Sequence, residues 1–188
     1  MIQQIITYPT PPSAQYNTDV RVFDEVVFSL LDDLKDTIVA NNLNGLAAFQ
    51  IGNYLNAIVI KREDGTFLEL INARLISNSG KITTTEQTAY FPNLSAEVTR
   101  FENIMVIYQD RNANQHSLNT SGAEAILLQR KIDYVFGSSF LNKLSPDEKK
   151  KFKKKLEFGS DVAISEVCPT TFKRNYIIKA MNFVMIAM

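Results

Sequence analysis

The sequence predicts an α+β domain followed by an apolar C-terminal extension. Apolar residues recur at helical spacing between residues 19 and 41, and again between residues 121 and 136. Short apolar and β-branched runs, separated by turn residues, lie between these two segments. The stretch from residue 176 onward is mostly apolar. We therefore expect one domain over residues 1–157 and an extension over residues 158–188.

Three helices are expected. The first covers Asp19–Asn41, with Thr18 or Asp19 as its N-cap. The second covers about Ser121–Phe136, where Ser121 is a favourable N-cap. The third begins near Pro146, because proline is favoured at the first helical position. A run of lysines follows in this third helix, and we interpret it as a solvated face rather than a phosphate-binding surface.

Extended segments fill the region between the first two helices. Patterns of apolar and β-branched residues predict strands or extended runs at Leu46–Gln50, Ala57–Lys61, Phe67–Ile76, Glu86–Phe91 and Glu97–Gln109. A polar turn then precedes Gln115–Leu118, which we expect to pair back as a hairpin.

Composition and charge exclude several classes of protein. Lys plus Arg and Asp plus Glu both number 20, so no net field favours nucleic acid or an anionic membrane as a partner. Neither a secretory signal nor a membrane span is visible, and we expect a cytoplasmic protein, or a virion protein if the source is viral. His116 and Cys168 are the only residues of their types, which argues against a transition-metal site of the usual kind.

Three blocks of sequence resemble the peptide deformylase family. They are Asn-Gly-Leu-Ala-Ala-Phe-Gln-Ile-Gly at 44–52, Glu-Gln-Thr-Ala-Tyr-Phe-Pro at 86–92 and Gln-Arg-Lys-Ile-Asp-Tyr-Val-Phe-Gly at 129–137. The family has Gly-Leu-Ala-Ala-Pro-Gln-Ile-Gly, Glu-Gly-Cys-Leu-Ser-x-Pro and Gln-His-Glu-x-Asp-His-Leu-x-Gly, in the same order. The resemblance covers roughly residues 1–157. It implies a deformylase-like fold, with antiparallel or mixed sheets around a central helix that carries the family's metal site.

The resemblance also implies a chemistry that this sequence departs from. The family holds a divalent metal with one Cys and two His, and a glutamate moves the proton. The Cys position is Thr88, the two His positions are Arg130 and Tyr134, and the glutamate position is Lys131. Hydroxyl groups are weak ligands at neutral pH, and an arginine stays protonated. We therefore expect no metal, no cofactor and no catalytic residue, so that the chain is not an enzyme.

Other parts of the family pattern are retained. Glu86 and Arg100 match a family ion pair that we interpret as structural, and Gln50 and the Ala89 N–H match the family's oxyanion donors. A remnant cleft is therefore expected, and its predicted residues are Gly45, Gln50, Thr88, Ala89, Arg130, Lys131 and Tyr134.

Two of the substituted positions leave alternatives open. Arg130 either forms a new anion or carboxylate site, or it fills the vacated space and pairs internally with Glu86 or Asp133. Lys131 would act as a nucleophile only if its amine were desolvated, which the sequence does not indicate. The ring of Tyr134 is expected to fill the cavity.

The predicted function is that of a catalytically inactive interaction or structural module in a larger assembly, in one version a virion component such as a phage tail or baseplate. Two alternatives are a non-catalytic binder of peptide termini and a residual hydrolase with a non-family active site. Protein partners are expected, in a hetero- or homo-oligomer. Their interface is predicted on the extension, at Ile178, Met181, Phe183, Val184, Met185 and Ile186.

Overall fold

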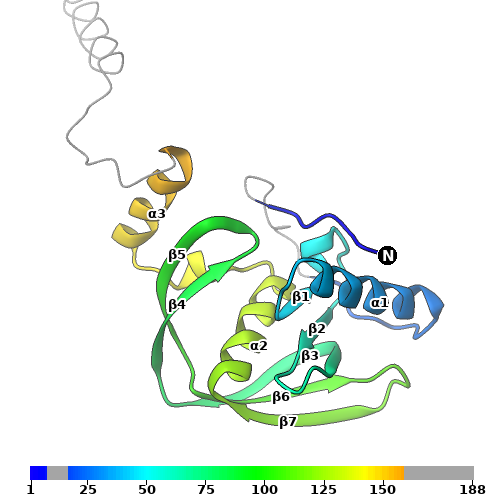
Figure 1. Cartoon of the computed structure of the whole chain (residues 1–188). Coiled ribbons are helices and arrows are strands. Elements are labelled where there is room, and N and C mark those ends of the chain that lie inside the picture. Colours follow the sequence, from blue (N-terminus) through cyan, green and yellow to red (C-terminus); the bar gives the residue numbers. More distant parts are fainter. Residues whose placement is uncertain (8–16, 159–188) are drawn as a thin grey trace, which may run out of the picture. The chain divides into compact units, whose positions relative to one another are not determined.

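The computed structural model of the chain describes residues 1–7 and 17–158 (Figure 1). The described residues up to Lys150 form one compact unit, and those from Lys151 onward belong to a second. The predicted interface residues of the extension lie outside the described part, so the domain boundary and the interface stay predictions. In chain order the elements are α1 (Glu25–Ala40), β1 (Gly45–Ala47), the 3-10 helix η1 (Ala48–Ile51), β2 (Ala57–Lys61), β3 (Phe67–Ser79), β4 (Ile82–Thr88), β5 (Phe91–Arg100), β6 (Asn103–Gln109), β7 (Gln115–Ser121), α2 (Gly122–Val135), the 3-10 helix η2 (Phe140–Lys143) and α3 (Pro146–Phe158).

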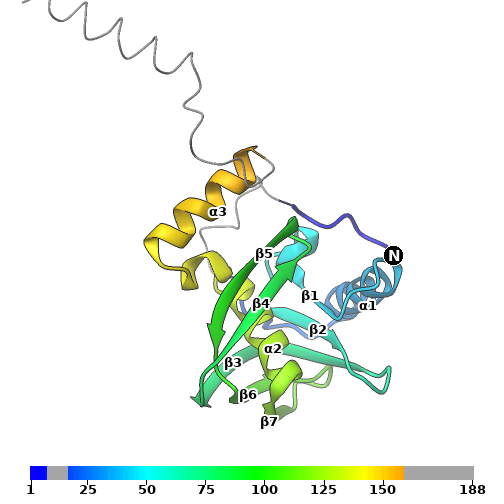
Figure 2. The same ribbon diagram turned by 60° about the vertical axis from the view of Figure 1, so that its left-hand side comes forward.

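The strands form two antiparallel sheets. Five of them make a sheet in the order β1-β2-β3-β6-β7, and β4 and β5 make a separate hairpin. The long strand β3 pairs with β2 through its first half and with β6 through its second, with register shifts after Ile71 and Leu75. In both views α2 lies between the β4–β5 hairpin and β1 (Figures 1 and 2). Elements from distant parts of the sequence therefore meet around α2.

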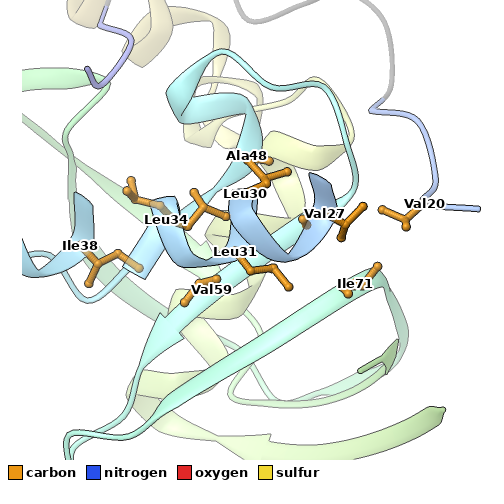
Figure 3. Packing of buried hydrophobic residues seen from close by; sticks show 11 residues of the cluster. Val20, Val27, Leu30, Leu31, Leu34, Ile38, Ala48, Val59 and Ile71 are labelled. Atoms are coloured by element: carbon orange, nitrogen blue, oxygen red, sulfur yellow. The ribbon is translucent and has the colours of Figure 1, made fainter. Parts of the chain in front are cut away.

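Helix α1 covers one part of the sheet. Its apolar residues at helical spacing are buried on one face, which packs against residues of β2, β3 and η1 (Figure 3). The prediction that the helix begins at Asp19 is wrong, because the cap is Asp24, whose carboxylate accepts from the N–H groups of Val26 and Val27. Asp19 instead binds Arg74, which holds the preceding segment outside the helix.

Strand β2 is buried on both faces. Ala57 and Val59 belong to the cluster under α1, and alternation along the strand turns Ile58 and Ile60 toward the opposite face. Helix α2 packs against β1, β2 and β3 and is therefore also part of the core. A continuous apolar run such as Ala57–Lys61 is the pattern expected of a strand that is covered on both sides.

The predicted strand Leu46–Gln50 is only partly correct. The strand ends at Ala47 and the chain turns into η1, where the Gln50 side chain accepts from the Ala47 N–H at 3.1 Å. At Gly45 a Cβ would lie 2.9 Å from the Val59 carbonyl oxygen, so only glycine allows β1 to approach β2 this closely. The strand and the turn together place Gln50 next to Lys131 of α2.

The run predicted as one extended segment, Glu97–Gln109, is two strands. It breaks after Arg100, where Gln129 of α2 donates to the Phe101 carbonyl at 2.8 Å and accepts from the Phe101 N–H at 3.0 Å. A side chain distant in the sequence takes the place of a strand partner there. Among the described residues, no helix has the length and apolar character needed to cross a membrane.

Candidate active site

A cleft of about 530 Å³ lies between η1, the end of β4 and helix α2. The residues predicted for the remnant cleft divide into two groups. Six of them line it: Gly45, Gln50, Thr88, Ala89, Arg130 and Lys131. The seventh, Tyr134, is buried and hydrogen-bonded to Thr88. The cleft is therefore open and is not filled by its own side chains.

Lys131 is a buried amine without a carboxylate partner. It is 5% exposed, and its Nζ donates to Gln50 Oε1 at 2.9 Å. Burial is the main cause that lowers the pKa of Lys131 to about 7. The positive charge of Arg130 also lowers this pKa, and the negative charge of Glu86, which acts more weakly, raises it. A substantial fraction of this amine is thus neutral at pH 7. No pattern in the sequence indicates this desolvation, because it depends on packing.

Gln50 presents an unused donor. Its Oε1 accepts from both the Ala47 N–H and Lys131 Nζ, and these two donors fix the orientation of the amide. The Nε2 group therefore lies on the other side of the amide, where it is buried and has no hydrogen-bond partner among the described residues. A buried donor without an acceptor carries a desolvation cost that a ligand oxygen would relieve.

Tyr134 and Thr88 form a second pair beside the cleft. The Tyr134 hydroxyl and Thr88 Oγ1 are 3.1 Å apart, and burial raises the pKa of Tyr134 to about 12, so the phenol stays protonated. The ring of Tyr134 stacks on Phe49 with centroids 6.0 Å apart and contacts Tyr90 edge-on at 6.2 Å. Phe49 stands where the family has proline, so the two departures from the family pattern contact each other.

A network of ion pairs connects Asp133 of α2 with Arg100 of β5 and Glu86 of β4. Arg100 binds Glu86 with two hydrogen bonds of 2.6 and 3.0 Å and Asp133 with one of 2.6 Å. Although burial opposes it, the bond to Glu86 and the charges of both carboxylates raise the pKa of Arg100. Arg130 donates to the Gln87 carbonyl, and its Nε lies 3.6 Å from Glu86, too far for a hydrogen bond. Asp133 is bound by Arg100 and not by Arg130.

The donor set at this cleft does not fit a divalent metal ion. Thr88, Arg130 and Tyr134 stand at the positions that the sequence resemblance assigns to the family's ligands, and neither a protonated guanidinium nor a phenol of raised pKa ligates a cation readily. The described residues contain no group of three or more His, Cys, Asp and Glu side chains able to hold one. His116 lies on β7 and is bound to Asp110 at 2.8 Å.

Comparison with known proteins identifies the family. The family model described as polypeptide deformylase matches residues 2–150. A peptide deformylase of Wolinella succinogenes is 36% identical over 160 residues, covering 81% of this chain and 94% of that protein. One from Helicobacter pylori (strain Shi470) is 35% identical over 161 residues, covering 82% and 92%. A crystal structure of a peptide deformylase from Legionella pneumophila superposes with a TM-score of 0.77 at 28% identity, covering 84% of this chain and 94% of that one.

These comparisons establish the family and the fold of the chain. The chain belongs to the peptide deformylase family, and the predicted α+β fold class is confirmed. The prediction that the chain is not an enzyme is contradicted, because relatives about 35% identical over four fifths of it are named peptide deformylase. The family membership was visible in the sequence, whereas the step from lost ligands to lost activity was wrong.

Proposed function

We propose that the chain binds the N-terminal end of a formylated peptide in the cleft and hydrolyses the formyl amide. The names of the relatives support the reaction, and the cleft at the family's site supports its location. The observation that carries the proposal is the unpartnered Gln50 Nε2 beside the Lys131 amine. One group is a hydrogen-bond donor for an oxyanion, and the other is a base that is partly neutral at physiological pH.

The proposed reaction uses the chain's own groups. Gln50 Nε2 and the Ala89 N–H donate to the formyl oxygen. The lone pair of neutral Lys131 takes a proton from water, and the resulting hydroxide attacks the formyl carbon. The bond between this carbon and the peptide nitrogen then breaks, and the nitrogen receives the proton from Lys131. Formic acid and the free amine are formed with Lys131 neutral again, and the acid then passes its proton to the amine. The products are formate and a free amino terminus carrying an ammonium group, so atoms and charges balance.

The size of the expected effect follows from the two groups. General-base catalysis contributes about 10²–10⁴-fold and one oxyanion donor about 10²–10³-fold. Together they amount to about 10⁴–10⁷-fold over the uncatalysed reaction if the two effects multiply. This is a modest acceleration, so a sensitive assay of formate release is required.

Formate release from a formyl-methionyl peptide tests the proposal, measured with chelator-treated protein and again after adding iron, nickel or zinc. We expect metal-independent release that Lys131→Met lowers by about 10²–10⁴-fold and Gln50→Leu by about 10²–10³-fold. Lys61→Met is the matched control, because Lys61 is an exposed lysine at the end of β2. No release above buffer would overturn the proposal. Release only with metal would show that the cleft recruits ligands other than those assigned to it.

We further propose that the chain works with protein partners. Apolar side chains exposed near α1, namely Val22, Val26 and Val39, support this in the described part of the chain. The names of the relatives reported above do not point to a virus particle, so the proposal is limited to a protein partner. Sedimentation of the purified chain over a range of concentrations tests self-association, and a single monomeric species throughout would exclude a homo-oligomer.

A further inference from the structure

The cleft has an unusual charge distribution. Among the described residues that line it, only Arg130 and Lys131 carry an ionisable charge, and both are basic. The lining contains no Asp or Glu. A site that received a metal cation would need the opposite arrangement.

The carboxylates nearest to Arg130 are already engaged. Both oxygens of Glu86 are hydrogen-bonded to Arg100, and Asp133 is bound by Arg100 and lies 3.5 Å from Lys143. The network therefore sets two carboxylates against three basic side chains, Arg100, Arg130 and Lys143. One positive charge is left without a counter-ion, even before Lys131 is protonated.

Arg130 carries part of this charge to the cleft, and its Nε forms an ion pair with Glu86 Oε2 at 3.6 Å. This Nε is buried and has no hydrogen-bond partner within the described part of the chain. Gln50, which is 1% exposed and lines the same cleft, holds an unpartnered donor. The buried Gln50 donor, beside two basic side chains that are the only charged ones among the described lining residues, matches the acceptors of a carboxylate.

We propose that Arg130 and Lys131 make this cleft a carboxylate-binding site. The proposal deepens the proposed function, and it rests on that function only for the identity of the ligand. Two sources present the same chemistry: the formate released by the reaction, and an acidic side chain of the bound peptide. Arg130 also lines the adjoining groove of about 970 Å³, so it can contact either one.

Equilibrium binding tests the site without turnover. In the first arm, sodium formate is titrated against sodium chloride at constant ionic strength, and the ¹H–¹⁵N resonance of the Arg130 Nε–H group is followed. A three-atom ligand binds no more tightly than about 1 mM, so a saturable millimolar shift is expected with formate and none with chloride. Arg130→Gln should abolish saturable formate binding measured by ¹³C relaxation, and Arg130→Lys should weaken it.

The second arm uses acetylated dipeptides, which carry no formyl group. Acetyl-Met-Asp should bind about tenfold more tightly than acetyl-Met-Asn, and the ratio should fall to about one in Arg130→Gln. Arg62→Gln is the matched control, because Arg62 lines the groove but already binds Glu124 at 3.0 Å. Unchanged melting temperatures in the variants exclude unfolding as the cause.

Each outcome has a defined meaning. Saturation by formate alone identifies the product as the ligand, and discrimination between the dipeptides alone identifies an acidic substrate; either supports the site. Formate no better than chloride together with equal dipeptide affinities would overturn it, even if the chain hydrolyses formyl peptides. Carboxylate binding without any hydrolysis would instead leave the site standing and refute the proposed function.

Discussion

Replacing Lys131 with methionine should stabilise the protein at neutral pH. The side chain is buried, and its amine has one hydrogen bond, to Gln50 Oε1, and no carboxylate partner. Methionine has nearly the same length and no charge to desolvate. Gln50 Oε1 keeps the Ala47 N–H as a donor in the variant, so no acceptor is left unpaired.

The magnitude follows from the titration of Lys131. Lowering the pKa of Lys131 from 10.5 to about 7 means that folding disfavours the charged amine, relative to the neutral amine, by about 5 kcal/mol. Between these pH values the unfolded chain holds a proton that the folded chain lacks, so the free energy of unfolding rises with pH. The free energy of unfolding of the wild type at pH 7 should therefore be about 4 kcal/mol lower than its value at high pH. The hydrogen bond to Gln50 favours the charged amine, so this is an upper figure, and we expect 2–4 kcal/mol as an order of magnitude.

Urea denaturation from pH 6.5 to 10 measures this effect. The difference between Lys131→Met and the wild type isolates one residue, because every other group titrates in both proteins. We expect about 2–4 kcal/mol in favour of the variant near pH 7, shrinking toward zero as pH approaches 10.5. Lys61→Met, a change at an exposed lysine, should leave the dependence of the free energy of unfolding on pH unchanged. A difference that does not vary with pH would refute the argument that burial holds this amine neutral.

Three further outcomes are expected. Arg100→Met removes two hydrogen bonds from the buried Glu86 and one from Asp133, and should cost about 3–5 kcal/mol of unfolding free energy in urea; a loss below 1 kcal/mol would contradict the view that this ion pair is shielded from water. Tyr134→Phe keeps the ring packing and loses one hydrogen bond, so it should cost about 1 kcal/mol, and a much larger loss would indicate a wider role for the hydroxyl. The kcat/KM for formyl-peptide hydrolysis should rise through pH 7 as Lys131 deprotonates and should then level off; a profile falling over that range would exclude Lys131 as the base.

Much of the fold could be predicted from the sequence. The strand Ala57–Lys61 has the predicted bounds, and α2 runs one residue inside its predicted range at each end. The segment before Glu25 was wrongly included in the first helix, because its apolar residues continue the helical pattern. The backbone N–H of Val20 instead binds the side chain of Asn72, 52 positions away, which no local pattern contains.

The cleft residues were found from the family pattern, but their chemistry was not. Sequence comparison located Lys131 and Gln50 at family positions, and only the structure shows that one binds the other. Desolvation of Lys131 comes from the elements that surround α2 and leaves no trace in the residues beside it. For Arg130 the interpretation of internal pairing agrees with an ion pair of 3.6 Å between its Nε and Glu86 Oε2, and the guanidinium also donates to the Gln87 carbonyl, which the sequence did not indicate.

The substituted positions behave as one unit rather than as separate losses. The amine of Lys131 has its acceptor in Gln50, and the hydroxyl of Tyr134 has its acceptor in Thr88. The ring of Tyr134 is stacked on Phe49, itself a departure from the family pattern. Returning Tyr134 alone to histidine would remove the donor to Thr88 and leave space against Phe49, so the costs of single reversions are not additive. The polar contacts of Lys131 with Gln50 and of Tyr134 with Thr88 therefore act together in defining the chemistry of this cleft.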